Sequence, residues 1–591
     1  MTSPKRPGAV VDTNVASPRR DGGIDHGESA STTEGVLTVV RQFAQDLGSR
    51  RPLSRKIDLD SALDTDLGID SLGRAELLHR LELAFRIRLP EDLLARAETV
   101  RDLHTAIEQA APGGARLDVR QVQQVASAES AEATDADTLI DTLEWHAAAH
   151  PNRAHCILLD TAENAQTVTY ETLATNAKCV AAGLRQAGLI EGDRVAIMLP
   201  TGTDFLYAFF GALYAGGVPV PLYPPVRMSH IEEHLHRQTG ILKNAGATAF
   251  ITVPAGLRLA TLIEPLVPTL RLVTTVDSIR GQGPEPQERP KGCDPAVIQY
   301  TSGSTGDPKG VVLSHANILS NIRAMGTAMT VEPDDVFVSW LPLYHDMGLI
   351  GAWLGSLYYG TPIAMMSPLQ FIVRPESWLW AIHRYRGTVT AAPNFAYELC
   401  LQNIGDAMIE GLDLSSLRLA VSGAEPVSAS TLRRFSARFA KFGFDANALA
   451  PSYGLAENTV GLTCSPPGRG MITDRIDRSA LDRDGKAVPA SATDANAVEI
   501  VACGRPLPGH QVRILDATGR EAPDRQEGSL QFRGPSATQG YLNSDAQTRA
   551  LFDDSWLNTG DLGYFADGDV FLTGRNKDLI IRAGRNIHPH E

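Results

Sequence analysis

The segment Tyr300-Thr-Ser-Gly-Ser-Thr-Gly-Asp-Pro-Lys-Gly310 follows directly on the apolar run Ala-Val-Ile-Gln at residues 296–299. Its three glycines allow the backbone to approach a ligand closely and to adopt positive φ angles. Its backbone amides, four hydroxyl side chains and one lysine together are suited to surround an anion. The segment therefore predicts a phosphate-binding loop placed at the end of a buried strand.

This loop has two alternative interpretations. A flexible surface loop is one, because Gly and Ser are common turn formers, but the abrupt start after a buried-type strand argues against it. A Walker A loop is the other, and it requires Ser or Thr directly after the lysine. Here Lys309 is followed by Gly310 and Val311, so that motif is excluded.

Strand-like runs alternate with amphipathic helical runs from Asp137 onward. This alternation predicts an α/β domain with a largely parallel sheet. The predicted strands include residues 194–200, 217–223, 247–253, 271–276 and 296–302, and residues 170–188 are typical of an amphipathic helix.

Four further motifs follow the loop in order. They are Ser422-Gly-Ala-Glu-Pro426, Ser452-Tyr-Gly-Leu-Ala-Glu457, Thr559-Gly-Asp561 and Gly574-Arg575-Asn-Lys-Asp578. Each alone is a weak signal, and an isolated Glu457 would more often be only a solvated carboxylate. With the loop they make five motifs in the order found in the adenylate-forming superfamily of acyl-CoA synthetases, luciferases and adenylation domains. The chain resembles that superfamily from about Leu139 to its last residue.

The resemblance implies that ATP and Mg²⁺ bind here and that a carboxylate attacks the α-phosphorus. It implies Tyr453 against adenine, Glu457 on Mg²⁺, Asp561 at the ribose hydroxyls and Arg575 at the sugar and hinge. Catalysis of such a step is mainly positioning and neutralisation of charge, to which Lys309 would contribute. The implied catalytic residues are Lys309, His345, Glu457 and Arg575. The implied ATP or AMP contacts are Thr301, Ser302, Gly303, Ser304, Thr305, Gly306, Asn394, Gly423, Ala424, Glu425, Ser452, Tyr453, Gly454, Asp561 and Arg575.

Two segments resemble the fatty acyl-AMP ligase branch, namely Trp340-Leu-Pro-Leu-Tyr-His-Asp-Met-Gly-Leu-Ile350 and Ala392-Pro-Asn-Phe-Ala-Tyr397. In that branch His345 would lie by the acyl and phosphate groups and Asn394 near the nucleotide; a lone His would otherwise be read as a core residue. An apolar stripe follows the histidine and fits an acyl tunnel or plain helix core equally well. The stripe comprises Trp353, Leu354, Leu357, Tyr358 and Tyr359.

A long polar stretch lies between Gly461 and Gly504. It resembles the insertion that separates acyl-AMP ligases from acyl-CoA synthetases, which in the family is linked with restricted subdomain movement and disfavours coenzyme A as acceptor. A surface loop without that role is the alternative. The resemblance also implies a further small domain with a reacting lysine after the hinge, so residues 576–591 are predicted to be the hinge and the start of a truncated C-terminal subdomain.

Near the amino terminus, Leu67-Gly68-Ile69-Asp70-Ser71-Leu72 precedes a helical apolar pattern. A serine at a helix start is often only a cap, yet the free amides there also favour a phosphate. Residues 34–111 resemble an acyl carrier protein, in which this serine, Ser71, would carry 4′-phosphopantetheine at the start of the second of four helices. The face after it is more basic than in a typical carrier, with Arg74, Arg80, Arg86 and Arg88.

Bulk composition narrows the function classes. The 591 residues are too many for one core, and the formal net charge of −15 argues against nucleic acid as a partner. The six cysteines show no pairing or zinc spacing, and no apolar run is long enough to span a membrane, so we expect a cytoplasmic protein without stable membrane insertion. Residues 1–33 are predicted to be a disordered leader and residues 112–136 a flexible linker, in which residues 118–125 favour at most a short helix.

The predicted fold is thus multidomain, with an all-α four-helix carrier bundle followed by an α/β adenylate-forming large subdomain with parallel-rich sheets at residues 137–575. The predicted function is ATP-dependent activation of a fatty acid to an acyl-adenylate, followed by transfer to a pantetheine thiol on a carrier in cis or in trans. A phosphopantetheinyl transferase is then the implied modifying partner. An acyl-CoA synthetase and a non-catalytic carrier and nucleotide-binding module are the alternatives.

Overall fold

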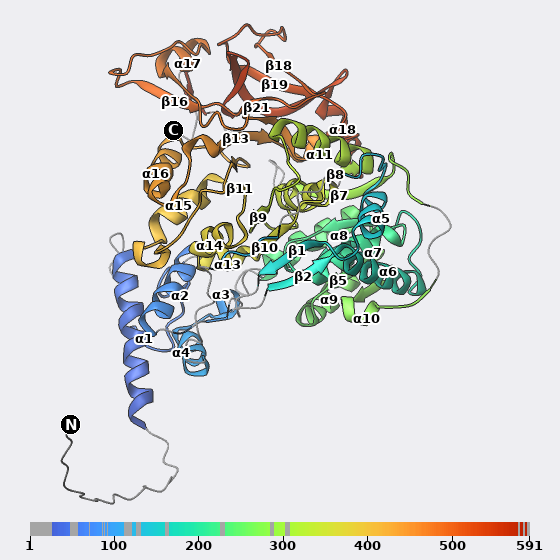
Figure 1. Cartoon of the computed structure of the whole chain (residues 1–591), viewed down its shortest axis with the longest axis vertical. Coiled ribbons are helices and arrows are strands. Elements are labelled where there is room, and N and C mark those ends of the chain that lie inside the picture. Colours follow the sequence, from blue (N-terminus) through green and yellow to red (C-terminus); the bar gives the residue numbers. More distant parts are fainter. Residues whose placement is uncertain are drawn as a thin grey trace, which may run out of the picture.

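Figure 1 shows the computed structural model of the chain. The structure describes residues 26–47, 57–69, 71–85, 87, 89–90, 93–110, 121–125, 132–159, 165–224, 231–283, 289–301, 308–576, 580–582 and 585–587.

The amino-terminal segment contributes helices α1 (His26–Leu47), α2 (Ser71–Phe85), α3 (Leu93–Arg96) and α4 (Val100–Gln109). Residues 36, 40 and 43 of α1 and residues 77, 78 and 81 of α2 are buried in one apolar core with side chains of α3 and α4, as the three- and four-residue spacing predicts. Thr99 begins α4 with a capping box, in which the Asp102 carboxylate accepts the Thr99 backbone N–H at 2.8 Å.

Helix α1 begins at His26 and therefore extends into the segment predicted as a leader, whereas residues 1–25 lie outside the described residues. Residues 121–125 of the predicted linker are not helical. The Gln123 backbone N–H donates to the Arg384 carbonyl at 2.7 Å, so this part of the linker lies against the large domain.

A nine-stranded sheet forms the centre of the large domain, in the order β17-β14-β13-β12-β11-β9-β10-β1-β2. The six strands from β13 to β1 are parallel, and β2, β14 and β17 are antiparallel additions at the edges. The strands are β1 (Ala154–Leu159), β2 (Ala165–Thr169), β9 (Phe337–Ser339), β10 (Ile363–Met366), β11 (Val389–Ala392), β12 (Leu419–Ser422), β13 (Leu449–Gly454), β14 (Gly461–Cys464) and β17 (Arg505–Pro506).

A second parallel sheet has the order β4-β3-β5-β6, from β3 (Arg194–Met198), β4 (Val218–Pro221), β5 (Ala247–Thr252) and β6 (Leu272–Thr274). The predictions of these four strands and of helix α6 (Tyr170–Gln186) are confirmed. The other helices of the large domain are α5 (Leu139–Ala149), α7 (Thr203–Tyr214), α8 (Ile231–Ala245), α9 (Leu257–Ile263), α10 (Val276–Ile279), α11 (His315–Met329), the π-helix Met347–Leu354, α12 (Gly355–Tyr359), α13 (Pro368–Val373), α14 (Glu376–Tyr385), α15 (Asn394–Asn403) and α16 (Ala429–Phe439).

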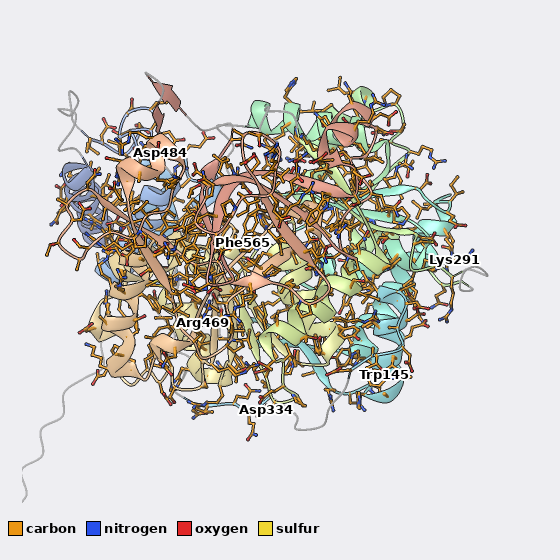
Figure 2. All side chains as sticks on the ribbon, turned by 90° about the horizontal axis from the view of Figure 1, so that it is seen from above. Trp145, Lys291, Asp334, Arg469, Asp484 and Phe565 are labelled. Carbon is orange, nitrogen blue, oxygen red and sulfur yellow. The ribbon has the colours of Figure 1, made fainter. Side chains whose placement is uncertain are left out.

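An antiparallel sheet of β18 (Gln511–Leu515), β19 (Gly528–Arg533), β20 (Phe552–Asp553), β21 (Trp556–Ala566) and β22 (Asp569–Arg575) lies at one end of the molecule, with α18 (Asp545–Leu551) beside it (Figure 1). A buried ion pair fixes it to the chain after β14, because Arg469, labelled in Figure 2, donates to the Asp569 carboxylate at 2.7 Å.

The predicted insertion forms a hairpin of β15 (Thr473–Asp477) and β16 (Ala497–Val501) with α17 (Arg478–Asp484) between them. Its Ile476 and Leu481 are buried against Tyr564 and Phe571 of the antiparallel sheet. The polar stretch is therefore a packed element. Beyond β22 the structure describes the short strands β23 (Ile580–Arg582) and β24 (Arg585–Ile587).

The carboxyl ends of the parallel strands β9 to β13 meet at one edge of the nine-stranded sheet. Ligands of open α/β sheets bind at that edge, because the loops that follow the strands converge there. The segments that follow these strands contain six of the site residues predicted from the sequence, namely His345, Asn394, Gly423, Ala424, Glu425 and Glu457.

Candidate active site

The predicted phosphate loop is the turn of a β-hairpin. Strand β7 (Pro295–Thr301) pairs with β8 (Lys309–Ser314), and Thr301 lies opposite Lys309. The hairpin fixes both ends of the loop, while the loop residues Ser302, Gly303, Ser304, Thr305 and Gly306 lie outside the described residues. At its base the Tyr300 hydroxyl donates to the Asn244 side chain at 2.5 Å, which joins β7 to α8.

Lys309 and Glu457 meet on the two sides of a tyrosine that the motifs did not single out. The Lys309 ammonium lies 4.7 Å from the centre of the Tyr541 ring, within cation–π range. The Tyr541 hydroxyl donates to Glu457 Oε1 at 2.6 Å. Tyr541 thus places a predicted phosphate-binding cation and a predicted Mg²⁺ ligand in one cluster.

The backbone around Tyr541 keeps this cluster in position. The Leu542 N–H donates to the Gly310 carbonyl at 2.8 Å, next to Lys309, and the Thr538 N–H donates to the Glu457 carbonyl at 2.8 Å. Residues 538–542 therefore link β8 to the segment that contains Glu457. The available sequence signal for Tyr541 was a Gly-Tyr pair eight residues after a strand, which is weak.

A second cluster joins three predicted residues from three strands. The Tyr453 hydroxyl donates to Asp561 Oδ2 at 2.5 Å, and Arg575 Nε donates to Asp561 Oδ1 at 3.2 Å. Asp561 and Arg575 are cross-strand partners on β21 and β22, whereas Tyr453 is on β13. Burial, followed by the Asp561 charge, raises the pKa of the Tyr453 phenol well above its usual value, so Tyr453 is a proton donor at neutral pH.

The segments after β11 and β12 hold each other by reciprocal hydrogen bonds. Asn394 Oδ1 accepts the Ser428 backbone N–H at 3.0 Å, and Glu425 Oε1 accepts the Phe395 backbone N–H at 2.6 Å. Between them, Ala424 has φ +67°, a left-handed conformation that costs a non-glycine residue free energy and is concentrated at functional sites. Asn394, Ala424 and Glu425 therefore lie together.

Two glycines of the predicted motifs are required by close backbone contacts. A Cβ at Gly423 would lie 2.9 Å from the Ser452 carbonyl oxygen, and a Cβ at Gly454 would lie 1.7 Å from the Val460 carbonyl oxygen. Ser452 stands between them, and its hydroxyl donates to the Ala450 carbonyl at 3.1 Å. The end of β12 is thus packed against β13, and the end of β13 against the turn before β14, without room for a side chain at either glycine.

His345 lies on the connection between β9 and the π-helix and is half exposed, with 53% of its side chain accessible. Its Nδ1 is 2.7 Å from the Asp346 carboxylate, and that charge raises the pKa of the imidazole. The sequence motif contains Asp346, but its effect on His345 is visible only in the structure. The pair makes His345 a more persistent cation than an isolated histidine.

The apolar stripe after His345 is helix core in this structure. Trp353, Leu354 and Leu357 are fully buried, and the Trp353 indole N–H donates to His155 at 2.9 Å. Its ring also packs edge-on against Phe209 at 5.3 Å. Of the two readings of the stripe, the structure favours core over an acyl tunnel.

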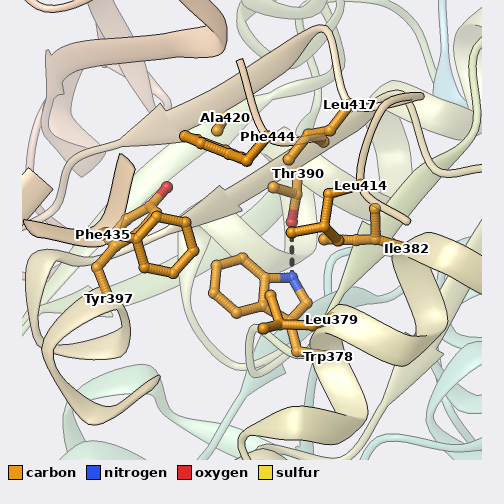
Figure 3. A pocket seen from close by; sticks show the side chains of 10 residues that line it. All are labelled: Trp378, Leu379, Ile382, Thr390, Tyr397, Leu414, Leu417, Ala420, Phe435 and Phe444. Carbon is orange, nitrogen blue, oxygen red and sulfur yellow. Dashed lines mark hydrogen bonds between the residues drawn. The ribbon is translucent and has the colours of Figure 1, made fainter. Parts of the chain in front are cut away.

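A separate group of apolar side chains, around Trp378, lies beside α15 (Figure 3). The Trp378 indole N–H donates to the Thr390 hydroxyl at 3.0 Å, and aromatic rings from α15 and α16 close around it. The space between these side chains is closed even to a water molecule. It is packed core between β11, β12 and the helices that cover them.

The protein-family comparison decides which family these clusters belong to. The model described as AMP-binding enzyme matches residues 143–542, and that described as phosphopantetheine attachment site matches residues 38–107. The chain belongs to the AMP-binding enzyme family. Lys309, Glu457 and Tyr541 lie in the first match, as does Tyr453, whereas Asp561 and Arg575 follow it in the chain. Ser71 lies in the second match.

Curated members of the family are similar over most of their length. A medium-chain-fatty-acid–[acyl-carrier-protein] ligase of Moorena producens is 34% identical over 77% of this chain and 79% of its own. A long-chain-fatty-acid–AMP ligase of Mycolicibacterium smegmatis is 35% identical over 72% of this chain and 71% of its own. A putative acyl-CoA synthetase of Caulobacter vibrioides is 34% identical over 73% and 75%.

Solved structures of the family share the fold. One from a study of fatty acyl-adenylate ligases from E. coli and L. pneumophila is 35% identical, with a TM-score of 0.74, over 78% of this chain and 83% of that one. The L. pneumophila fatty acyl-adenylate ligase in complex with acyl adenylate and pyrophosphate is 34% identical, with a TM-score of 0.69, over 76% and 78%. The adenylate-forming α/β fold with a parallel-rich sheet, predicted from the sequence, is confirmed.

Members of the AMP-binding enzyme family use ATP and Mg²⁺, and the phosphopantetheine attachment site carries 4′-phosphopantetheine. Ser71 is the first residue of α2 in the structure, the helix start that the motif predicted. None of the helices in the described ranges is both long and apolar enough to cross a membrane.

Proposed function

We propose that this chain activates a fatty acid with ATP and transfers the acyl group to the thiol of a pantetheine arm on Ser71. The observation that carries the first half is the convergence of Lys309 and Glu457 on Tyr541. It supplies a cation at the base of the phosphate loop and a carboxylate, both in contact with Tyr541. The phosphopantetheine match at residues 38–107 supports the second half.

The chemistry consists of two displacements. A carboxylate oxygen of the fatty acid forms a bond to the α-phosphorus as the bond to the bridging oxygen breaks and pyrophosphate leaves. The pantetheine thiolate then attacks the acyl carbon, and AMP leaves with the electron pair of the broken C–O bond. Lys309 neutralises charge on the departing pyrophosphate, and His345, whose pKa the Asp346 carboxylate raises, is a second group available to the anionic reactants.

The residues fit ATP with Mg²⁺. The Asp561 carboxylate is an acceptor-only group, which suits the two ribose hydroxyls, and Tyr453 and Arg575 hold it in position. Glu457 offers a hard oxygen ligand, and one or two protein carboxylates are usual for Mg²⁺ that arrives with a nucleotide. Mg²⁺ would supply charge neutralisation at the phosphates. The hinge role of Arg575 and the nucleotide contacts of Asn394, Gly423, Ala424, Glu425, Ser452 and Gly454 are part of this proposal.

For the carrier, we assign residues 34–111 to a four-helix bundle composed of α1 to α4 and residues 137–575 to the adenylating large subdomain. The start of α2 is a suitable place for a phosphodiester, because its backbone amides point toward it. A phosphopantetheinyl transferase would install the arm. The predictions of a cytoplasmic location and of a truncated C-terminal subdomain after the hinge stay predictions.

ATP–pyrophosphate exchange with fatty acids of increasing chain length tests the activation step. Exchange that depends on fatty acid and on Mg²⁺, and that falls steeply in Lys309→Ala, is expected. The matched control is Lys441→Ala, which removes an exposed lysine paired with Asp406. Fatty-acid-independent exchange, or full exchange in Lys309→Ala, would contradict the proposal.

Transfer to coenzyme A is the second candidate, because one relative is a putative acyl-CoA synthetase. The packed hairpin 473–501 favours the carrier instead. It packs on the antiparallel sheet and contacts α16 through Arg433, which donates to the Glu499 carboxylate at 2.7 Å. Product analysis with coenzyme A and pantetheinylated carrier in competition separates the two acceptors.

A further inference from the structure

Helix α13 lies between the amino-terminal helices and the large domain and has a face in the core of each. Phe371 is fully buried in the core of the large domain, whereas Val373 belongs to the core formed by α1 to α4. Leu369 and Ile372 also pack against that second core. A single short helix therefore joins the two bodies by apolar contact.

A buried ion pair accompanies this contact. Arg374 directly follows α13 and donates to both oxygens of Glu82 on α2, each at 3.0 Å. The two side chains are only 7% and 9% exposed. The same guanidinium donates to the Leu89 carbonyl at 3.1 Å, and Glu82 accepts the Leu89 N–H at 2.8 Å, so the charges are satisfied on several sides.

A desolvated bidentate pair of this kind favours one relative placement, because any other docked placement would bury one of the two charges without its partner. Arg74 pairs with Asp64 and Arg80 with Glu76, both within the carrier segment. The large domain thus supplies the cation and the carrier the acid.

Two further observations connect this contact to the rest of the molecule. The connecting segment also lies on the large domain, where Gln123 donates to the Arg384 carbonyl of α14 and Val125 packs against the large-domain core. On the large-domain face of α13, the Phe371 ring stacks on the Trp340 ring with ring centres 4.0 Å apart. Trp340 lies on the connection between β9 and the π-helix, which also contains His345.

We infer that α13 and Arg374 form the docking surface for this chain's own carrier segment, which is held on its adenylating domain through Glu82 between turnovers. This deepens the proposed function, on which it rests for naming the segment a carrier, by selecting the carrier in cis. Glu82 lies eleven residues after Ser71 on α2, about 16 Å along the helix, so the docked end is the one remote from the pantetheine site.

Hydrogen–deuterium exchange of the whole chain tests the docking without requiring turnover. In Arg374→Ala, amides of α13 and of the second half of α2 should exchange at least about tenfold faster, as expected when a buried charge loses its partner. Amides of α4 and β11 should keep their protection, because each body retains its own core. Val373→Ala, which leaves the ion pair, should give a smaller increase in the same segments.

Asp60→Asn is the matched control, because it removes an exposed ion pair with Arg101 inside the carrier segment. It should leave α13 unchanged. Unchanged exchange of α13 and α2 in Arg374→Ala would overturn the docking surface. Loss of protection spread over the whole large domain would also overturn it, because Arg374 would then be a fold residue. Failure of pyrophosphate exchange would count against the proposed function and leave this result unaffected.

Discussion

Replacing Tyr541 by phenylalanine removes one oxygen atom and should impair the use of Mg²⁺. The lost hydroxyl donates to Glu457 at 2.6 Å, and a hydrogen bond to a charged group contributes about 1.5–3 kcal/mol. That corresponds to a loss of about 10- to 150-fold. Because both residues are only partly buried, we expect the lower half of this range.

The ring itself remains in Tyr541→Phe, so the cation–π contact with Lys309 is retained. Tyr541→Ala removes both interactions and should cost about another 0.5–1 kcal/mol. The loss in Tyr541→Phe therefore measures the hydrogen bond to Glu457, and the additional loss in Tyr541→Ala measures the contact of the ring with Lys309.

The assay is ATP–pyrophosphate exchange across a Mg²⁺ titration. Tyr541→Phe should require more Mg²⁺ for half-maximal exchange, in line with the about 10- to 100-fold losses seen when an outer partner of a metal ligand is removed. Tyr344→Phe, which alters a tyrosine near the same edge, is the control. Unchanged rate and unchanged Mg²⁺ requirement in Tyr541→Phe would refute the reasoning.

Three other perturbations follow from the site. Asp561→Asn should weaken ATP binding by about tenfold or more, because the charged acceptor shared by Tyr453 and Arg575 is lost. Calorimetry measures the ATP affinity, and an unchanged affinity would contradict the ribose role of Asp561. The Asp346 carboxylate raises the pKa of His345, so the ion pair stabilises the fold fully below the ordinary imidazole pKa, and this stabilisation is lost as the pH rises through the raised pKa. Asp346→Asn should therefore move the alkaline decline of pyrophosphate exchange to lower pH. An unmoved pH profile would exclude His345 as the titrating group. Gly454→Ala should lower the free energy of unfolding by about 1–3 kcal/mol or more, because the new Cβ meets the Val460 carbonyl; an unchanged thermal midpoint would show that the turn relaxes.

Much of the site follows from local motifs because most of them lie at the end of a strand, whereas Thr559-Gly-Asp561 lies within β21. Strand β7 follows from an apolar run that stops at a Gly- and Ser-rich segment, whereas Lys309 was expected in the loop and is the first residue of β8. Asp561 and Arg575 follow from resemblance, and their pairing across β21 and β22 follows from a short hairpin between them. In these places the local pattern and the final contact involve neighbouring residues.

The contacts that were not predicted join residues far apart in the chain. Tyr541 reaches Glu457 across 84 residues, and Arg374 reaches Glu82 across 292. Hydrophobic periodicity does not specify which buried carboxylate an arginine meets, since that depends on how two separately folded bodies pack. The fate of the stripe at Trp353 was open for the same reason, because a tunnel wall and a helix core have the same apolar pattern.

Intact-mass measurement of the pantetheinylated chain, incubated with ATP, Mg²⁺ and a mixture of fatty acids, tests the central claim most directly. The account predicts a mass increase equal to an acyl group bound as a thioester to the arm, which is released by hydroxylamine and absent from Ser71→Ala. An acyl mass that persists in Ser71→Ala, or acyl transfer to coenzyme A alone with the arm left bare, would contradict it.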